Sequence, residues 1–571
     1  MQRLQLPDSP AGFADATWDD LRPYFETLAT MPVSEGEVEA WLGEWSRLEE
    51  LVTEAAGRAM IAYTADTSDP AKEAAHLRFS SEIFPVMEEQ GVRLARRLLE
   101  FGYTRADLEV VLRRFRTQIE IFREESVPLF AELEELSARY QRLTGGITVE
   151  WDGERKTVPQ LLPFLKQPDR AVRERAFRAI SAPYIDLRAD LAGLFDEMYT
   201  RRQRIASEAG LPDFEAYAFR AKCRFDYTPA DCTRFHEAVE AAVVPAVTRI
   251  LDRRRQRLGL QRLRPWDLDV DPSGRPPTRP FATADELARK SADVFRAVAP
   301  ELGEQFDTMR RERLLDLESR KGKAPGGYCE TLHASGRPYI HMNAVGLVDD
   351  VMTLLHEAGH AFHAFAAHPQ PFIWQRYVGS EAAELASMTM ELLAAPRLDG
   401  PGGLFTAEAL RLARIEHLED VLVTLTHVAS VDAFQRWIYT SGEGHDPEAR
   451  DRAWLRIRGR FEGVVDWSGL ERERVARWYR QLHVFLYPFY YIEYGLAQLG
   501  ALQIWRRSRQ DHAAAVRSYR AALALGSTTS LPEMFGVAGA RFTVDADVVA
   551  DLVALVEEEL ERLHAGAPAV A

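Results

Sequence analysis

Cysteine is scarce in this chain of 571 residues, which contains only Cys223, Cys232 and Cys329. The three residues are widely separated, and none of them forms a Cys-x-x-Cys pair. Such a chain has too few cysteines to build a disulfide framework, and this pattern is typical of a protein from a reducing compartment.

The chain also lacks long uncharged apolar segments. No run of about 18 apolar residues, the length that crosses a bilayer as a helix, occurs in the sequence. Residues 1–8 lack the basic start and the apolar core of a secretory signal peptide. We therefore expect a cytoplasmic protein with no membrane partner.

Positive charge is in deficit. The chain has 71 Lys and Arg against 87 Asp and Glu, which gives a net charge of −16 and a pI near 5.5. No basic face balances this acidity, so we expect no nucleic-acid partner. The glycine-rich stretch 322–327 is not followed by Gly-Lys-Ser/Thr, which excludes a phosphate-binding loop at that place.

The rest of the composition is that of a folded globular protein, with 46% hydrophobic and 28% charged residues, and the length allows more than one domain. Amphipathic helical patterns, whose aromatic residues are best interpreted as core, extend to about residue 145. Residues 147–158 alternate around Asp152-Gly153 and predict a β-hairpin. We place a boundary here, between an N-terminal helical region at 1–145 and a second region at 146–571.

The strongest motif is His-Glu-x-x-His at His356, Glu357 and His360, within an apolar run that begins at Val351. Residues four apart on a helix project from one face, so the two imidazoles can share one metal ion. Glu357 lies about 100° further round the helix, where its carboxylate can accept a proton from a metal-bound water. The motif therefore predicts half of a zinc site, with Glu357 as the general base.

The same helix contains two further residues that need an explanation. Gly359 costs ~1 kcal/mol relative to Ala inside a helix, and it predicts that another backbone packs closely against this position. His363 lies on the face of the two motif histidines, but as a ligand it would crowd the same turn. We interpret His363 as a core histidine or as one that supports the ligands.

A catalytic zinc needs three protein ligands and one open position. The extended metzincin pattern requires Gly at 363 and His at 366, and the chain has His363 and Ala366, so that class is excluded. The other common arrangement takes a Glu from a following helix. The stretch 379–391 supplies Glu381, Glu384 and Glu391, and the spacing alone leaves the choice among them open.

Together these residues resemble a known family. His356-Glu-Ala-Gly-His360, followed by Glu384-Leu-Ala-Ser387 and Glu391, is similar to the thimet oligopeptidase family of zinc peptidases, and most similar to its bacterial oligoendopeptidase F branch. The resemblance also includes residues 321–329, 338–343, Asp350 and 487–495, so it spans roughly the last half of the chain. In that family the third zinc ligand is the Glu that matches Glu384.

The resemblance implies a mainly α fold of two lobes around a deep channel, with a small β-sheet beside the active site. The strand expected at 328–332 would form an edge that can pair with an extended substrate. Read from the residues alone, the stretches 328–332 and 339–342 predict a plain hairpin with a turn at Ser335-Gly336.

A tyrosine-rich stretch, 482–495, is the last feature that carries chemistry. Tyrosines on such an apolar background are often packing residues, but phenolic hydroxyls beside a zinc are suitable donors to an oxyanion. Tyr487 and Tyr494, seven residues apart, match the two tyrosines that the family places in this way. The resemblance also includes a histidine before them, for which His483 is the nearest match. Tyr491 is a weaker candidate for a catalytic role.

We therefore expect a zinc metalloendopeptidase that cleaves short unstructured peptides, with one zinc per chain held by His356, His360 and Glu384. Residues 146–571 would then be the catalytic region with the zinc site and the channel. Two alternatives stay open. A metallocarboxypeptidase of similar fold would need a basic pocket for the terminal carboxylate of its substrate, and a catalytically silent peptide-binding protein is disfavoured by the presence of Glu357.

Overall fold

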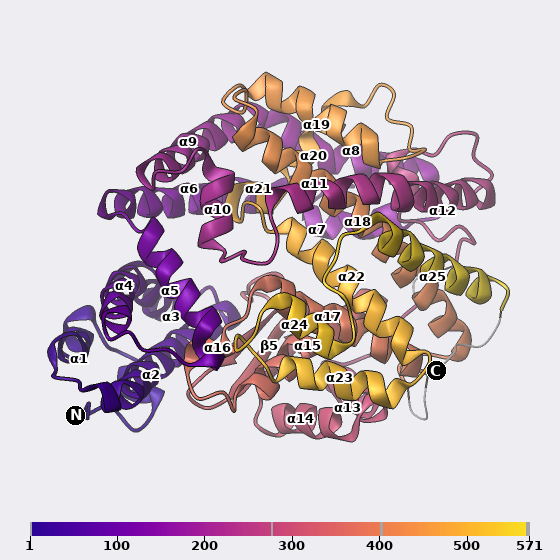
Figure 1. The fold of residues 1–571 in the computed structure, drawn as a ribbon. Helices are drawn as coiled ribbons and strands as arrows, with labels where there is room; N and C mark the ends of the chain where they lie inside the picture. The colour runs from indigo at the N-terminus through magenta and orange to yellow at the C-terminus, as the bar shows by residue number, and fades with distance from the viewer. Residues whose placement is uncertain (1–2, 276–277, 400–402, 567–571) are drawn as a thin grey trace.

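The computed structural model describes residues 3–275, 278–399 and 403–566, and it is mainly helical with two small sheets (Figure 1). The mainly α fold that the sequence predicts is confirmed. Within the described ranges, the structure contains no helix that is both long enough and apolar enough to cross a membrane.

Helices form most of the described chain. The first group is α1 (Trp18–Thr30), α2 (Val38–Ala65), α3 (Pro70–Leu77), α4 (Phe84–Glu100), α5 (Glu109–Ile121) and α6 (Val127–Gly145). The second group is α7 (Val158–Leu165), α8 (Arg170–Asp186), α9 (Arg188–Glu208), α10 (Phe214–Ala221), α11 (Pro229–Ala238), α12 (Val244–Arg257), α13 (Ala284–Val298) and α14 (Pro300–Arg311). The third group is α15 (Val348–Ala367), α16 (Ile373–Arg376), α17 (Ser380–Ala394), α18 (Ala407–Thr440), α19 (Pro447–Phe461), α20 (Glu471–Tyr479), α21 (Leu482–Leu486), α22 (Tyr491–Ser508), α23 (His512–Leu523), α24 (Leu531–Ala538) and α25 (Ala546–His564).

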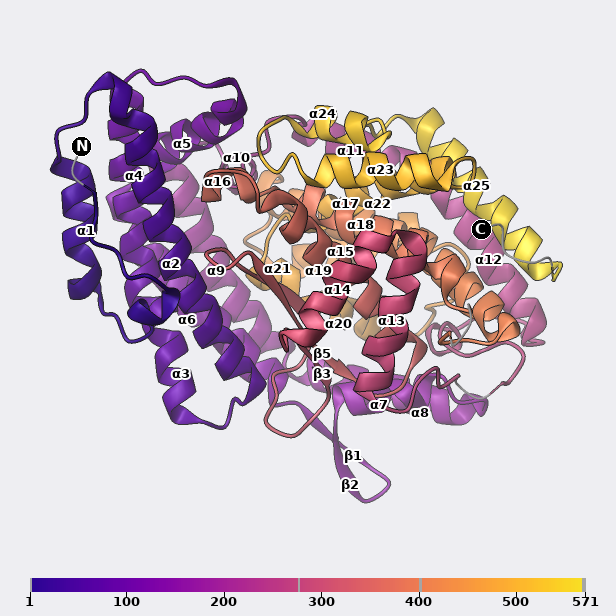
Figure 2. The same cartoon turned by 90° about the horizontal axis from the view of Figure 1, so that it is seen from below.

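The hairpin predicted around Asp152-Gly153 is confirmed. Strands β1 (Thr148–Trp151) and β2 (Glu154–Thr157) pair antiparallel, and Asp152 and Gly153 have φ of 52° and 84°. Two consecutive positive φ values are what a two-residue hairpin turn of the favoured twist requires. Figure 2 shows this hairpin projecting from the body of the molecule.

A three-stranded sheet lies beside α15, in the order β3–β5–β4. Strands β4 (Tyr328–Leu332) and β5 (Arg337–Ala344) pair antiparallel as predicted, and β4 is at the edge. The sequence did not predict β3 (Leu315–Glu318), which pairs parallel with β5. The buried ammonium of Lys323 donates to the carbonyls of Glu318 and Met342, and so ties the end of β3 to β5.

The N-terminal helices have an apolar core of their own, which includes Trp41 and Trp45 as expected. Trp45 packs on Trp374 of α16 with ring centroids 4.3 Å apart, so this core also holds a later segment of the chain. From Ile121 onward most of the buried apolar residues belong to a second, larger core, apart from those of α16 and a small cluster around Trp266. The division at residues 145 and 146 stays a prediction.

Figure 1 shows how the elements are arranged around the predicted site. Helices α6 and α8–α12 with α19–α21 lie on one side, α13–α17 with α23 and α24 lie on the other, and α22 runs between them. Helix α17 packs against both α15 and α22.

Two glycines let these helices approach closely. A Cβ on Gly359 of α15 would lie 2.5 Å from Ser387 Cα, and one on Gly500 of α22 would lie 2.7 Å from a methyl of Leu385. The close backbone contact predicted at Gly359 is confirmed, and it places α15 directly against α17.

Candidate active site

The helix that carries the His-Glu-x-x-His motif is fixed at its N-terminus by Asp350. One carboxylate oxygen of Asp350 accepts the backbone N–H groups of Val345, Gly346 and Leu347, each at 2.8 Å. Helix N-termini expose unpaired N–H groups with a partial positive charge, so this carboxylate both caps α15 and favours its dipole. The cap fixes where α15 begins and therefore the directions in which the motif side chains project from it.

The structure brings His356, His360 and Glu384 together. Nε2 of His356 lies 3.2 Å and Nε2 of His360 lies 3.8 Å from the same carboxylate oxygen of Glu384. These residues form a group whose possible ligand atoms all lie within 4.8 Å of one another. The histidines come from α15 and the glutamate from α17, whose backbones are in contact at Gly359.

The two other glutamates considered from the sequence are engaged elsewhere. Glu381 accepts a hydrogen bond from the hydroxyl of Tyr227 at 2.6 Å. Glu391 bridges two histidines, with one oxygen 2.7 Å from Nδ1 of His356 and the other 2.9 Å from Nε2 of His417 on α18. Neither glutamate belongs to the group of possible metal ligands formed by His356, His360 and Glu384.

The donor set fits a catalytic metal. Two imidazole nitrogens and one carboxylate oxygen are the protein ligands of one common class of catalytic zinc site. Nδ1 of His356 is bound to Glu391, which leaves Nε2 as the nitrogen available to a metal. Histidines that bind a metal are usually oriented in this way, by a hydrogen bond from the other ring nitrogen to a carboxylate. Ser387 donates to Glu384 at 2.9 Å and so fixes the third carboxylate.

Burial shapes the pKa values of these groups. Burial lowers the pKa of His360 to about 4, which favours the neutral imidazole that a metal binds. Burial raises the pKa of the Glu384 carboxyl, but the hydrogen bond with His356 and the two histidines outweigh it, so the pKa falls to about 2. Burial raises the pKa of Glu357 to about 7; the charge of His356 opposes this rise, and the charges of Glu384 and Glu391 add to it.

Glu357 is buried beside the small sheet. Its carboxylate lies 3.6 Å from the position that a Cβ on Gly327 would occupy, just before β4. The charges of His356, Glu384 and Glu391 all act on it, so Glu357 is close to the donor set. His363 is also buried, and in the part of the chain that the structure describes its Nε2 has no hydrogen-bond partner.

The tyrosine-rich stretch runs from α21 into α22 and reaches Glu384 through Tyr490. Tyr487 is 54% exposed, whereas burial, followed by the charge of Glu384, raises the pKa of Tyr494 above its usual range. The ring of His483 lies among Tyr487, Tyr490, Tyr491 and Tyr494, at centroid distances of 4.8–6.3 Å. Tyr491 is bound at its hydroxyl by Gln481, with a distance of 2.7 Å.

Sequence reasoning missed two residues that the structure places at the site. The hydroxyl of Tyr490 donates to the free oxygen of Glu384 at 3.1 Å, and His417 reaches Glu391. Tyr490 is four residues before Tyr494, so its place in the same tyrosine-rich stretch was an available signal. His417 is a single histidine on a long helix, and no local pattern distinguishes it.

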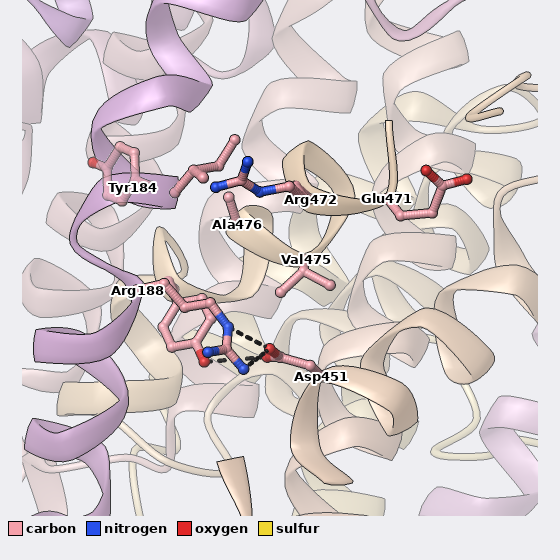
Figure 3. Close-up of a pocket in the computed structure, with 9 residues that line it drawn as sticks. Tyr184, Arg188, Asp451, Glu471, Arg472, Val475 and Ala476 are labelled. Atoms are coloured by element: carbon pink, nitrogen blue, oxygen red, sulfur yellow. Dashed lines mark hydrogen bonds and ion pairs between the residues drawn. The ribbon is translucent and has the colours of Figure 1, made fainter. Parts of the chain in front are cut away.

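A separate cavity of about 250 Å³ lies among α8, α9, α19 and α20 (Figure 3). Arg188 and Asp451 form an ion pair on its wall at 2.5 Å, and the hydroxyl of Tyr479 donates to Asp451 at 3.1 Å. The lining residues include none of the predicted site residues, so this cavity is distinct from the candidate active site.

The fold and the donor set are those of a known class of protein. A model of Peptidase family M3 matches residues 164–553, which is more than half of the chain. The chain therefore belongs to Peptidase family M3, and the resemblance drawn from its sequence is confirmed. Membership in this family indicates a metallopeptidase and implies a divalent metal.

Individual relatives agree. The chain is 25% identical to oligopeptidase PepF of Bacillus subtilis over 442 residues, and 22% identical to an oligoendopeptidase F homolog of Borreliella burgdorferi over 408 residues. These matches cover 72% and 67% of this chain but only 60% and 64% of the two relatives. The solved structure of PZ peptidase A with an inhibitor superposes with a TM-score of 0.88 at 27% identity, over 96% of this chain and 97% of that one.

Proposed function

We propose that this protein is a zinc-dependent oligoendopeptidase that cleaves internal bonds of short, unstructured peptides. The observation that carries the proposal is the convergence of His356, His360 and Glu384, with possible ligand atoms within 4.8 Å of one another, in a member of a peptidase family. Relatives named as oligopeptidase and oligoendopeptidase F support cleavage of peptides at internal bonds. The scarcity of cysteine supports a cytoplasmic location.

His356, His360 and Glu384 would hold the zinc. When bound, a zinc ion supplies a Lewis acid that polarises the scissile carbonyl and makes water a better nucleophile at neutral pH. Glu357 accepts the proton of the attacking water and later delivers it to the leaving amine. Tyr487 and Tyr494 donate hydrogen bonds to the carbonyl oxygen as negative charge develops on it, and His483 lies among them as a further donor.

The substrate would bind as an extended chain along the edge of β4. Two observations support this position: β4 lies at the edge of its sheet, and the residue before it, Gly327, is next to the Glu357 carboxylate. A peptide that adds to a sheet edge is held by backbone hydrogen bonds and so needs no particular sequence. A folded domain cannot present such a strand without unfolding, which costs about 5–15 kcal/mol.

Mass-spectrometric mapping of products from a peptide mixture tests the reaction class. We expect fragments from internal cleavage, abolished by chelation, restored by zinc and absent with Glu357→Gln. Release of single residues from the C-terminus would instead identify a metallocarboxypeptidase. If zinc-loaded protein binds peptides but forms no products, the protein is a catalytically silent peptide-binding protein.

A length series of disordered peptides tests the restriction to short substrates. The series is assayed beside one folded protein and the denatured, alkylated form of the same protein. We expect the rate to fall as the peptides lengthen and the folded protein to resist. Efficient cleavage at internal sites of the folded protein would contradict the enclosed, extended binding mode.

A further inference from the structure

Buried arginine side chains hold the backbone of the tyrosine segment, defined here as residues 482–494. Arg202 of α9 donates to the carbonyls of Val484 and Phe485. Arg224, in the connection between α10 and α11, donates to the carbonyl of Phe489. The two guanidinium groups therefore grip the segment on either side of Tyr487 and Pro488, from parts of the chain more than 200 residues away.

Phe489 is the point where the segment turns from α21 to α22, and its φ of 64° is in the left-handed region. A non-glycine residue in that conformation is costly and persists only where its surroundings determine it. Both backbone polar groups of Phe489 are bound by side chains: Gln435 accepts its N–H at 3.1 Å, and Arg224 donates to its carbonyl. The turn is thus set by long-range contacts.

Arg224 also connects the tyrosine segment to the helix of the metal ligands. The same nitrogen that reaches Phe489 lies 2.6 Å from the carboxylate of Glu493, one residue before Tyr494. Nε of Arg224 lies 3.9 Å from Glu381, three residues before Glu384 on α17. The side chains of Arg224, Glu493 and Glu381 are at most 4% exposed, so these charges interact with little screening by solvent.

A guanidinium is the group suited to this place. One of its nitrogens donates to both the Phe489 carbonyl and the Glu493 carboxylate, while its delocalised, permanent charge lies within ion-pair range of Glu381. A lysine ammonium keeps the charge but is a point donor on a flexible stem. Arg202 holds the other end of the turn and has no carboxylate partner in the described part of the chain, so of the two arginines only Arg224 connects the turn to α17.

We propose that Arg224 is a positioning residue: it holds the turn at Phe489 and thereby sets the hydroxyls of Tyr490 and Tyr494 at the correct distance from Glu384. This inference rests on the proposed function, because it assigns a role to the placement of those hydroxyls. A displacement of about 1 Å at a reacting group lowers rates by up to about 10²-fold. Arg224 acts on turnover through the tyrosines, and in the described residues it has no hydrogen bond or ion pair with His356, His360 or Glu384.

The experiment compares Arg224→Met and Arg224→Lys with Arg173→Met as a matched control. Arg173 is equally buried, binds Asp267 at 2.9 Å and the carbonyl of Trp266 at 3.0 Å, and in the described residues it contacts neither the tyrosine segment nor the metal ligands. Hydrogen exchange of peptides that cover residues 482–494 is measured first, since it needs no activity. We expect faster exchange there in Arg224→Met, an intermediate rate in Arg224→Lys and the wild-type rate in Arg173→Met.

Kinetics then separate a positioning role from general destabilisation. We expect kcat to fall about 10- to 100-fold in Arg224→Met with KM and zinc content nearly unchanged, and to recover partly in Arg224→Lys. In a double-mutant cycle with Tyr494→Phe, the two losses should be strongly non-additive, because both act on the same hydroxyl. If Arg224→Met does not fold, Arg224→Lys carries the same comparison.

Two results would overturn the inference: exchange in residues 482–494 no faster than in Arg173→Met, or fully additive losses of kcat with Tyr494→Phe. Neither result bears on whether the protein is a peptidase. Conversely, wild-type protein that holds zinc but cleaves no peptide would defeat the proposed function and leave the exchange measurement intact as a test of the turn.

Discussion

The two halves of the candidate site are built in different ways. The metal half consists of His356, His360 and Glu384, which stand on two regular helices whose backbones touch at Gly359. The tyrosine half stands on a turn between α21 and α22 that is held by side chains from distant parts of the chain. Local helix spacing therefore positions the ligands, whereas long-range contacts position the proposed oxyanion donors. We expect mutations in the metal half to change metal binding and those in the tyrosine half to change turnover alone.

The largest expected effect is that of Glu357→Gln. We expect kcat to fall by about 10⁴-fold or more with zinc content unchanged, because the change removes a base and leaves every ligand in place. Steady-state kinetics and metal analysis on the same preparation measure both quantities. Residual activity near the wild-type level would remove Glu357 from the proposed chemistry.

The next effect is that of the tyrosine hydroxyls. Tyr494→Phe and Tyr487→Phe should each lower kcat by about 10²-fold with KM nearly unchanged, since the donated bond forms only in the transition state. Zinc affinity should not change. Full activity combined with a lower melting temperature in both variants would return these tyrosines to a packing role.

A pair of histidines on α18 sharpens the comparison. His417 reaches Glu391 in the metal half, whereas His427 lies 3.1 Å from Gln481 in the tyrosine half. We expect His417→Gln to weaken zinc binding about 10- to 100-fold, because residues that orient a ligand contribute that much to metal affinity. His427→Gln serves as the control and should bind zinc as the wild type does. Equal zinc affinity in the two variants would show that Glu391 needs no support from His417.

The smallest effect expected is on stability, at the contact between the two ligand helices. A Cβ at residue 359 would lie 2.5 Å from Ser387 Cα, so Gly359→Ala forces α15 and α17 apart and should cost about 1–3 kcal/mol. A Cβ on Gly193 of α9 would have no neighbouring atom within 4 Å, so Gly193→Ala should be neutral or slightly stabilising. Chemical denaturation of both variants measures the difference, and equal stability would mean that the ligand helices can shift apart freely.

The same contrast explains what the sequence could predict. The spacing of His356, Glu357 and His360 is local, and so is the hairpin at Asp152-Gly153, so both were visible in the chain itself. The choice of Glu384 over Glu381 and Glu391 depended on a family resemblance, because all three lie on the same short stretch. Gly359 revealed a close contact without revealing its partner.

The residues that were missed depend on contacts between distant parts of the chain. Tyr490 reaches Glu384 across 106 residues, and Arg224 reaches Phe489 across 265. Strand β3 has only four residues and is defined by its parallel pairing with β5, so its own sequence carries little signal. Such features become visible only when the folded chain brings their partners together.

Zinc titration of the metal-free protein, with Glu384→Ala beside the wild type, tests the central claim most directly. The account predicts one tightly bound zinc per wild-type chain and loss of tight binding in Glu384→Ala, with Glu391→Gln weakened but still binding. If Glu384→Ala binds zinc as tightly as the wild type does, Glu384 is not the third ligand, and the division of the site into a metal half and a tyrosine half is wrong.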